Sequence, residues 1–190
     1  KMGIVIPESL ISSPSTGQVV QYLMSHAHLL AVVGMPEDLF KTSGKGGTHT
    51  KTCLIVAEKK KSIKSDDRMI FMAEAKWCGH DSRGTHIPHN DIPEILNNYR
   101  ASNTEFREGR LGYHISPDSI RGTALAPRYY NPEPNYTLEK LSKTHDLIKI
   151  QTLIDNGTIA ISTGDEVGKL AYGTGNIPFI RTSDLSNWEL

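Results

Sequence analysis

The residues with the clearest chemical potential lie around Phe40, where an aromatic ring is followed by a flexible, lysine-rich stretch. Phe40 ends an apolar segment, and the next seven residues, 41–47, include three glycines that leave the backbone unconstrained. Enzymes that modify a DNA base extrude it from the duplex and stack it against aromatic or apolar side chains. A ring beside lysines offers both stacking and phosphate contacts, although a ring at such a boundary is more usually part of a core.

Positive charge is concentrated in the same region of a chain that is neutral overall. Between residues 41 and 64 there are seven lysines and one acid, Glu58, which gives a local charge of +6 and leaves −6 for the rest. A basic block of this kind can follow DNA phosphates. We expect the phosphate contacts from Lys41, Lys45 and Lys51, whereas a solvated lysine-rich loop is the alternative interpretation.

A second group of chemically active residues follows the next apolar segment. It contains possible metal ligands: Cys78, His80, His86 and His89. The spacing of His86 and His89 suits zinc, but Cys78 and His80 are closer together than the usual pair of ligands. A metal-dependent α/β enzyme is therefore kept as an alternative to a polar loop without metal.

Other catalytic signatures are absent from the sequence. The stretch from Gly164 to Lys169 has three residues between its glycines, where a phosphate-binding loop needs four. There is no Gly-x-Ser-x-Gly segment for a hydrolase nucleophile. These patterns disfavour a nucleotide-binding loop and a serine hydrolase.

Composition restricts the class of protein. The chain has 190 residues, of which 37% are apolar and 22% charged, as in a globular protein. No apolar run approaches the roughly 20 residues that a membrane span needs. The two cysteines, Cys53 and Cys78, do not make a disulfide framework. We expect a cytoplasmic protein that does not contact a membrane.

The pattern of apolar residues predicts an α/β fold. The run at 3–7 is continuously apolar, which is typical of a strand buried on both faces, so its partner strands are expected in another segment. A helix is predicted at 18–28 and a strand at 29–33. Strands at 48–58 and 68–77 leave no room for a helix between them, which favours an antiparallel hairpin at the end of the sheet.

The second half of the chain has a different pattern of predicted elements. A helix is predicted at 90–107, and four prolines make residues 110–134 an irregular connection between domains. A second unit is expected from Tyr136, with apolar, helix-compatible residues followed by short strands between glycines. The segment 177–183 is predicted to be extended.

Taken in chain order, the predicted segments resemble the C-terminal half of the catalytic domain of DNA adenine-N6 methyltransferases. The likeness is to the modification subunits of type I restriction systems and to related fused enzymes in particular. The resemblance is carried by Gly3-Ile-Val-Ile-Pro-Glu-Ser-Leu10, by 29–40 and by Thr50-Lys-Thr-Cys-Leu-Ile-Val-Ala-Glu-Lys59. It continues through Ile70-Phe-Met-Ala-Glu-Ala75 to Gly79-His-Asp81, where the family usually has Gly-Tyr-Asp.

The resemblance implies a Rossmann-like methyltransferase sheet and a role for Phe40. In this family the ring at that position is expected to pack on the flipped adenine, and S-adenosylmethionine is the methyl donor. Two family motifs have no counterpart here: the glycine-rich turn that binds the cofactor and the Asn-Pro-Pro-aromatic motif that holds the adenine amino group. The isolated chain is therefore expected to contain no catalytic and no cofactor-binding residues and to be inactive.

The end of the chain resembles the start of a target-recognition domain from a specificity subunit. The phrase Gly175-Asn-Ile-Pro-Phe-Ile-Arg-Thr-Ser-Asp-Leu185 carries this likeness. It implies DNA contacts from Arg181, Thr182 and Ser183, for which a strand edge that merely packs is the alternative.

These likenesses divide the chain into three expected parts. Residues 1–89 are the C-terminal part of the methyltransferase domain, 90–135 a helical and irregular linker, and 136–190 the start of an α+β recognition domain. The expected partners are double-stranded DNA and other subunits or domains of a restriction-modification system. A non-catalytic DNA-binding module is the alternative function for the chain taken alone.

Overall fold

The computed structural model describes residues 1–37, 39–41, 50–61, 68–101, 105–163 and 168–176. The chain forms two compact units, Lys1–Lys143 and Thr144–Leu190. The part of the chain that the structure describes contains no helix long and apolar enough to cross a membrane.

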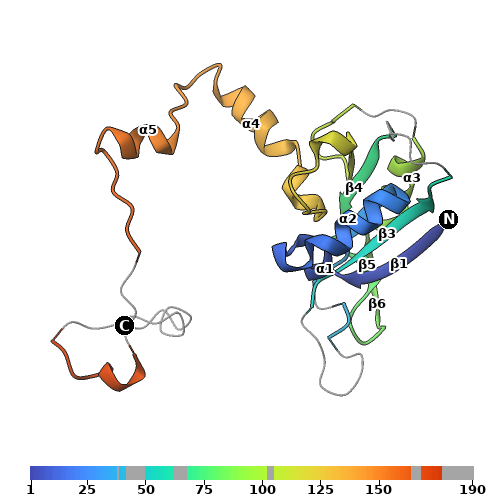
Figure 1. Ribbon diagram of the computed structural model, residues 1–190, viewed down its shortest axis with the longest axis horizontal. Helices are drawn as coiled ribbons and strands as arrows, with labels where there is room; N and C mark the ends of the chain where they lie inside the picture. Colours follow the sequence, from blue (N-terminus) through green and yellow to red (C-terminus); the bar gives the residue numbers. More distant parts are fainter. Residues whose placement is uncertain (38, 42–49, 62–67, 102–104, 164–167, 177–190) are drawn as a thin grey trace. The chain divides into compact units, whose positions relative to one another are not determined.

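The described part of the first unit contains seven strands and a set of short helices (Figure 1). The strands are β1 (Met2–Pro7), β2 (Ala27–Gly34), β3 (Thr52–Lys59), β4 (Ile70–Glu74), β5 (Cys78–His80), β6 (His86–Asn90) and β7 (Tyr113–Ile115). Its α-helices are α1 (Ser9–Ser12), α2 (Gly17–His26), α3 (Ile92–Arg100) and α4 (Glu133–Leu141). Its 3-10 turns are η1 (Pro14–Thr16), η2 (Pro117–Ser119) and η3 (Pro127–Tyr130).

Five of these strands form one mixed sheet in the order β1-β3-β2-β4-β7. Strands β1 and β2 both run antiparallel to β3, and β4 runs parallel to β2. Consequently β1, β2 and β4 share one direction, and their carboxyl ends lie at the same edge of the sheet. The remaining strands, β5 and β6, form a separate hairpin directly after β4.

Both faces of the sheet are covered by helices. On one face, α1 and α2 bury Ile11 and Val20 against alternate residues of β3, and on the other face α3 buries Ile95. Figure 1 shows these helices beside the sheet. Each such side chain contributes about 1.5–3 kcal/mol to folding when it is fully buried. The expected mixed α/β fold is confirmed in this respect.

The first strand differs from its prediction. The apolar run at 3–7 was expected to be buried on both faces, but β1 is an edge strand whose side chains Met2, Ile4 and Val5 are nearly half exposed. Among the described residues, β1 pairs only with β3. The strand prediction is thus correct, and the predicted burial is wrong because no strand of the described part of the chain pairs with the other edge of β1.

The predicted hairpin between 48–58 and 68–77 is also corrected. Both segments are strands, but β2 lies between β3 and β4 and pairs with each of them. The chain therefore does not turn back directly from β3 onto its neighbour. The antiparallel hairpin that ends this part of the fold is instead formed by β5 and β6.

The proline-rich segment 110–134 is more ordered than its composition predicts. Within it, β7 pairs antiparallel with β4 and completes the sheet. Leu125 and Ala126 are fully buried, and the Leu125 N–H donates to the Ile11 carbonyl at 2.6 Å. This segment therefore belongs to the packed structure of the first unit and is not only a connection.

The described part of the second unit contains α5 (Ile150–Asp155) and the 3-10 turn η4 (Lys169–Ala171). The short strands expected between its glycines are not found in 144–163 or 168–176. The extended segment predicted at 177–183 lies outside the described residues. The domain boundaries at 89 and 135 therefore stay predictions.

Candidate functional site

The candidate site lies at the edge of the sheet where β1, β2 and β4 end. In open α/β sheets, ligands bind in the crevice beyond the carboxyl ends of the parallel strands. Glu8 follows β1, Pro36 to Phe40 follow β2, and Ala75 to Trp77 follow β4. The segments that carry the predicted Phe40 and the hairpin histidines are thus brought to one edge.

Four charged side chains from separate parts of the chain are paired at this edge. The Glu8 carboxylate, only 8% exposed, lies 2.5 Å from Arg128 Nη1 and 3.7 Å from Lys51 Nζ. Lys51 Nζ also donates to Glu74 Oε2 at 2.7 Å. A Cβ at position 34 would come within 2.6 Å of the Glu74 carboxylate, so a larger residue there would make this carboxylate shift. Two carboxylates and two cations therefore neutralise one another.

The pairing changes the acidity of the groups involved. Burial opposes the charged form of Lys51, but its hydrogen bond to Glu74 and the nearby carboxylates outweigh this and raise the pKa of the ammonium. The hydrogen bond to Glu8 raises the pKa of Arg128. Burial, followed by the charge of Glu8, raises the pKa of the Cys53 thiol to about 12. Cys53 is therefore a core residue and not a nucleophile.

Because the Glu8 carboxylate is almost fully buried, its neutralisation should destabilise the first unit. We expect Glu8→Gln to lower the free energy of unfolding by about 2 kcal/mol, since it leaves Arg128 and Lys51 without this counter-charge. Urea unfolding followed by circular dichroism measures this difference.

An exposed ion pair provides the matched control for Glu8→Gln. Lys140 and Glu108 lie 2.6 Å apart, but both side chains are about half exposed. Glu108→Gln should therefore change stability by less than about 0.5 kcal/mol. Equal effects of the two substitutions would show that the buried cluster does not stabilise the fold.

Three of the four predicted residues near the lysine-rich stretch are described by the structure, and their surroundings differ. Phe40 is half-buried directly after the buried Leu39, and Lys41 is exposed. Lys45 lies outside the described residues. Lys51 is less available for phosphate than predicted, because its ammonium already pairs with Glu74 and Glu8. A basic segment cannot by itself reveal which of its lysines is paired in the folded protein.

The β5–β6 hairpin forms the other side of the edge and is held by two aspartates. The Asp91 carboxylate accepts hydrogen bonds from the backbone N–H groups of Lys76 and Trp77. The Asp81 carboxylate accepts from the N–H groups of Arg83 and Thr85 in the turn, and the hydrogen bond from Thr85 is the main cause of its lowered pKa.

The proposed metal ligands lie on this hairpin but do not converge. His80 and His86 are cross-strand partners, Cys78 faces Asn90, and the His89 ring lies against Trp77. Within the described ranges, no group of three or more His, Cys, Asp or Glu side chains is arranged to hold a metal ion. The structure therefore gives no support to the metal-enzyme alternative.

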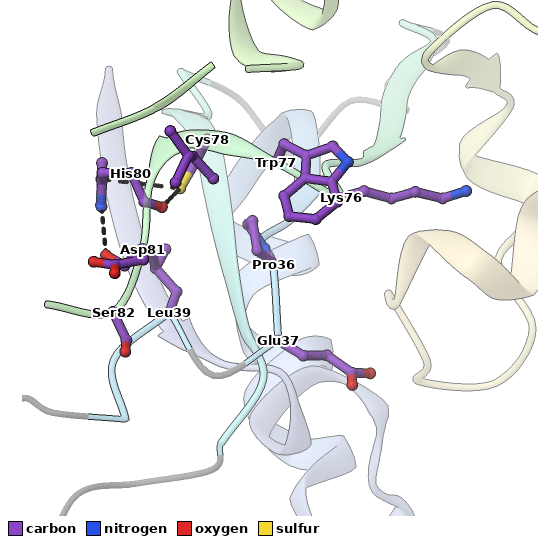
Figure 2. A pocket seen from close by; sticks show the side chains of 10 residues that line it. Pro36, Glu37, Leu39, Lys76, Trp77, Cys78, His80, Asp81 and Ser82 are labelled. Carbon is purple, nitrogen blue, oxygen red and sulfur yellow. Dashed lines mark hydrogen bonds between the residues drawn. The ribbon is translucent and has the colours of Figure 1, made fainter. Parts of the chain in front are cut away.

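A hollow of about 380 Å³ lies between this hairpin and the segment after β2. Its walls include Pro36, Leu39 and Ile87 together with Trp77, and Figure 2 shows the Trp77 ring next to Pro36. Sequence reasoning did not single out Trp77. The signal that could have identified Trp77 is its position shortly after the carboxyl end of β4, where ligands bind in sheets with parallel strands.

Neither Glu8, Glu74 nor Arg128 was predicted as part of a site. These residues are separated by more than 40 positions along the chain, so no local pattern connects them. The predicted DNA contacts Arg181, Thr182 and Ser183 lie outside the described residues and stay predictions.

Comparison with known proteins identifies one family. The model of a family described as N-6 DNA Methylase matches residues 1–124. No curated protein matches the chain.

Several solved structures are similar to the chain at low identity. A type I restriction-modification system methyltransferase subunit from Streptococcus thermophilus is 21% identical, with a TM-score of 0.45, over 63% of this chain and 23% of that one. A modification subunit of a proposed type I restriction enzyme from Vibrio vulnificus is 17% identical, with a TM-score of 0.47, over 72% and 28%. The chain thus spans about a quarter of the length of these structures.

Proposed function

Because this chain belongs to the N-6 DNA methylase family, we propose that its parent protein transfers a methyl group to N6 of adenine in double-stranded DNA. The methyl donor is S-adenosylmethionine, and the parent acts in a restriction-modification system of the type I kind. The observation that carries this proposal is the family match, which covers residues 1–124 and therefore most of the first unit.

The proposal assigns different parts of the reaction to different parts of the parent. Residues 1–89 supply the C-terminal part of the methyltransferase domain, and residues from 136 onward begin a domain that recognises the DNA target, with contacts from Arg181, Thr182 and Ser183. Residues 90–135 connect them. Other subunits or domains of the system are the proposed partners.

The cofactor is proposed to bind to residues of the parent other than those described here. After β1 the chain enters α1 through Glu8, without the glycine-rich turn that a cofactor of this kind requires. The nearby edge is filled by the paired side chains of Glu8, Lys51, Glu74 and Arg128. The residues present do not fit the cofactor, and the isolated chain is therefore proposed to be inactive.

The exposed edge of β1 supports a larger parent domain. Its apolar side chains border a hollow of about 620 Å³ that is also lined by α2. An exposed edge strand with unpaired backbone groups and apolar side chains can pair with another chain and aggregate. We propose that further strands of the parent sheet pair with this edge, which also accounts for the fully apolar run at 3–7.

The residues after β2 are proposed to contact the substrate. The target amino group is not accessible to an enzyme within the stacked duplex, so the adenine must be extruded. The half-buried ring of Phe40 is proposed to stack on this base. Lys41 and Lys45 are proposed to contact phosphates, and Lys51, which is already paired, contributes less to this contact.

Replacing Lys41 and Lys45 tests their proposed contact with phosphates. Lys41→Gln combined with Lys45→Gln in the parent should weaken binding to all DNA sequences equally and reduce the slope of log K against log salt by about 1.8. Fluorescence anisotropy over a salt series measures both quantities. A changed sequence preference with an unchanged slope would contradict a phosphate role.

A direct assay tests the function as a whole. The parent protein should transfer labelled methyl groups from S-adenosylmethionine to DNA, and nucleoside analysis of that DNA should show N6-methyladenine. The chain of 190 residues assayed alone should transfer none. Methylcytosine as the product, or activity of the chain alone, would refute the corresponding part of the proposal.

A second candidate function follows from the two missing motifs. Without a cofactor turn and an Asn-Pro-Pro-aromatic segment, the chain by itself is suited only to bind DNA for a partner. Absence of methyl transfer by the parent, with retained DNA binding, would favour this alternative.

A further inference from the structure

The hollow beside Trp77 has the size and lining of a ligand site. Its volume of about 380 Å³ lies within the range of about 300–1,000 Å³ found for small-molecule pockets. Its walls come from the segment after β2, which contributes Pro36 and Leu39, and from the segment after β4, which contributes Trp77 (Figure 2). Ile87 of β6 also lines it. The hollow therefore lies at the ends of two neighbouring parallel strands.

Trp77 is exposed at the wall of the hollow, and hydrogen bonds fix the backbone that carries its ring. The residue is 48% exposed, although its ring is large and mostly apolar. The backbone N–H of Trp77 donates to the Asp91 carboxylate at 3.0 Å, and its backbone carbonyl accepts from the Asp91 N–H at 3.0 Å. The centroid of the His89 ring lies 5.5 Å from that of the Trp77 ring. Because this backbone is already fixed, it loses little conformational entropy when a ligand stacks on the ring.

The charges around the hollow are compatible with a nucleotide. Lys76 lines it and can contact a phosphate, and Leu39 is followed directly by Phe40 and Lys41. Two acids also line it, but Asp81 is occupied by the hairpin turn. Glu37, which has no partner among the described residues, is left as an acceptor for an amino group.

We propose that this hollow receives an adenine base that has left the DNA stack, and that Trp77 stacks on it. The proposal rests on the function proposed above and adds a second aromatic residue to the site beside Phe40. Stacking on an aromatic ring is a usual way to hold an unstacked base.

A single-stranded probe tests the proposal because its bases need not be unpaired first. The full chain carrying Trp188→Phe retains Trp77 as its single tryptophan. A short oligo-deoxyadenylate and an abasic strand with the same number of phosphates are each titrated at low salt. Tryptophan emission reports stacking, and anisotropy of the labelled strand reports affinity.

We expect the oligo-deoxyadenylate to quench Trp77 and to bind about tenfold more tightly than the abasic strand, within the roughly 5- to 150-fold that one stacked base provides. Trp77→Ala should abolish the difference, and Trp77→Phe should retain most of it. Tyr22→Ala is the matched control, because Tyr22 is an exposed aromatic residue that lines the hollow between β1 and α2. It should leave the difference in affinity between the two strands unchanged.

Three results would overturn the proposal. Equal, salt-dependent binding of both strands with unchanged Trp77 emission would refute stacking and leave the phosphate contacts intact. A lower melting temperature of Trp77→Ala with an unchanged difference between the strands would identify Trp77 as a packing residue. Absence of binding to either strand would refute the stacking and also the proposed DNA contacts of this chain.

Discussion

Gly112→Ala should lower the free energy of unfolding of the first unit by about 4 kcal/mol, because two costs coincide at this position. Gly112 has φ of +94°, a conformation that other residues rarely adopt. A Cβ at this position would also lie 2.8 Å from Phe71 Cε2 and closer still to Cζ. Phe71 is 1% exposed and is held by the rings of Tyr99 and His114, so it cannot move aside easily.

A second glycine separates the two costs. Gly109 has a similar φ of +75°, but a Cβ there would meet nothing within 4 Å. Gly109→Ala should therefore lose only about 1–2 kcal/mol, the cost of the backbone conformation alone. In the Gly112→Ala background, Phe71→Leu should recover part of the loss, because the smaller side chain relieves the overlap. Equal urea midpoints for the two glycine variants would refute the packing argument.

The strands could be predicted from the sequence, but their neighbours could not. The apolar runs of β2 and β3 are local patterns, and the predicted strands are found within a few residues of the observed ones. The insertion of β2 between β3 and β4 depends on contacts between distant residues, for which periodicity carries no information. The prediction of a hairpin failed for this reason.

The misjudged burial of β1 has a different cause. An apolar run indicates that side chains are suited to burial, but it does not identify what buries them. In this chain Ile4 and Val5 are exposed at an edge, although their types are those of a buried strand. The disagreement is itself informative, because it is the pattern expected when part of the covering structure belongs to another segment.

The candidate site was predictable only where it is continuous in sequence. Phe40 and the lysines after it form one local pattern, and the structure places Phe40 and Lys41 in the segment that follows the carboxyl end of β2. The cluster of Glu8, Lys51 and Arg128 is assembled from three distant segments and has no such pattern. Because the Lys51 ammonium is paired within that cluster, we expect it to contribute less to phosphate contacts than its position in the basic segment predicts.

Phe40→Ala in the parent should lower kcat/KM for methyl transfer about 50-fold, which is in the range expected for the loss of one stacked base. The affinity for DNA should fall less than about threefold, because phosphate contacts position the protein and are untouched by this change. Phe40→Tyr should retain most of the activity, since it keeps the ring. Steady-state methylation kinetics and anisotropy titrations on the same DNA measure the two effects separately.

A mismatch at the target adenine distinguishes base stacking from a structural role of Phe40. A mismatched base is easier to extrude, so part of the stacking energy that Phe40 supplies is no longer needed. The defect of Phe40→Ala should therefore be smaller on mismatched than on paired DNA, whereas a damaged fold would reduce methylation of both substrates equally. If Phe40→Ala methylated paired DNA at an unchanged rate, the ring would have no role in stacking. The half-buried Phe40 would then serve packing alone.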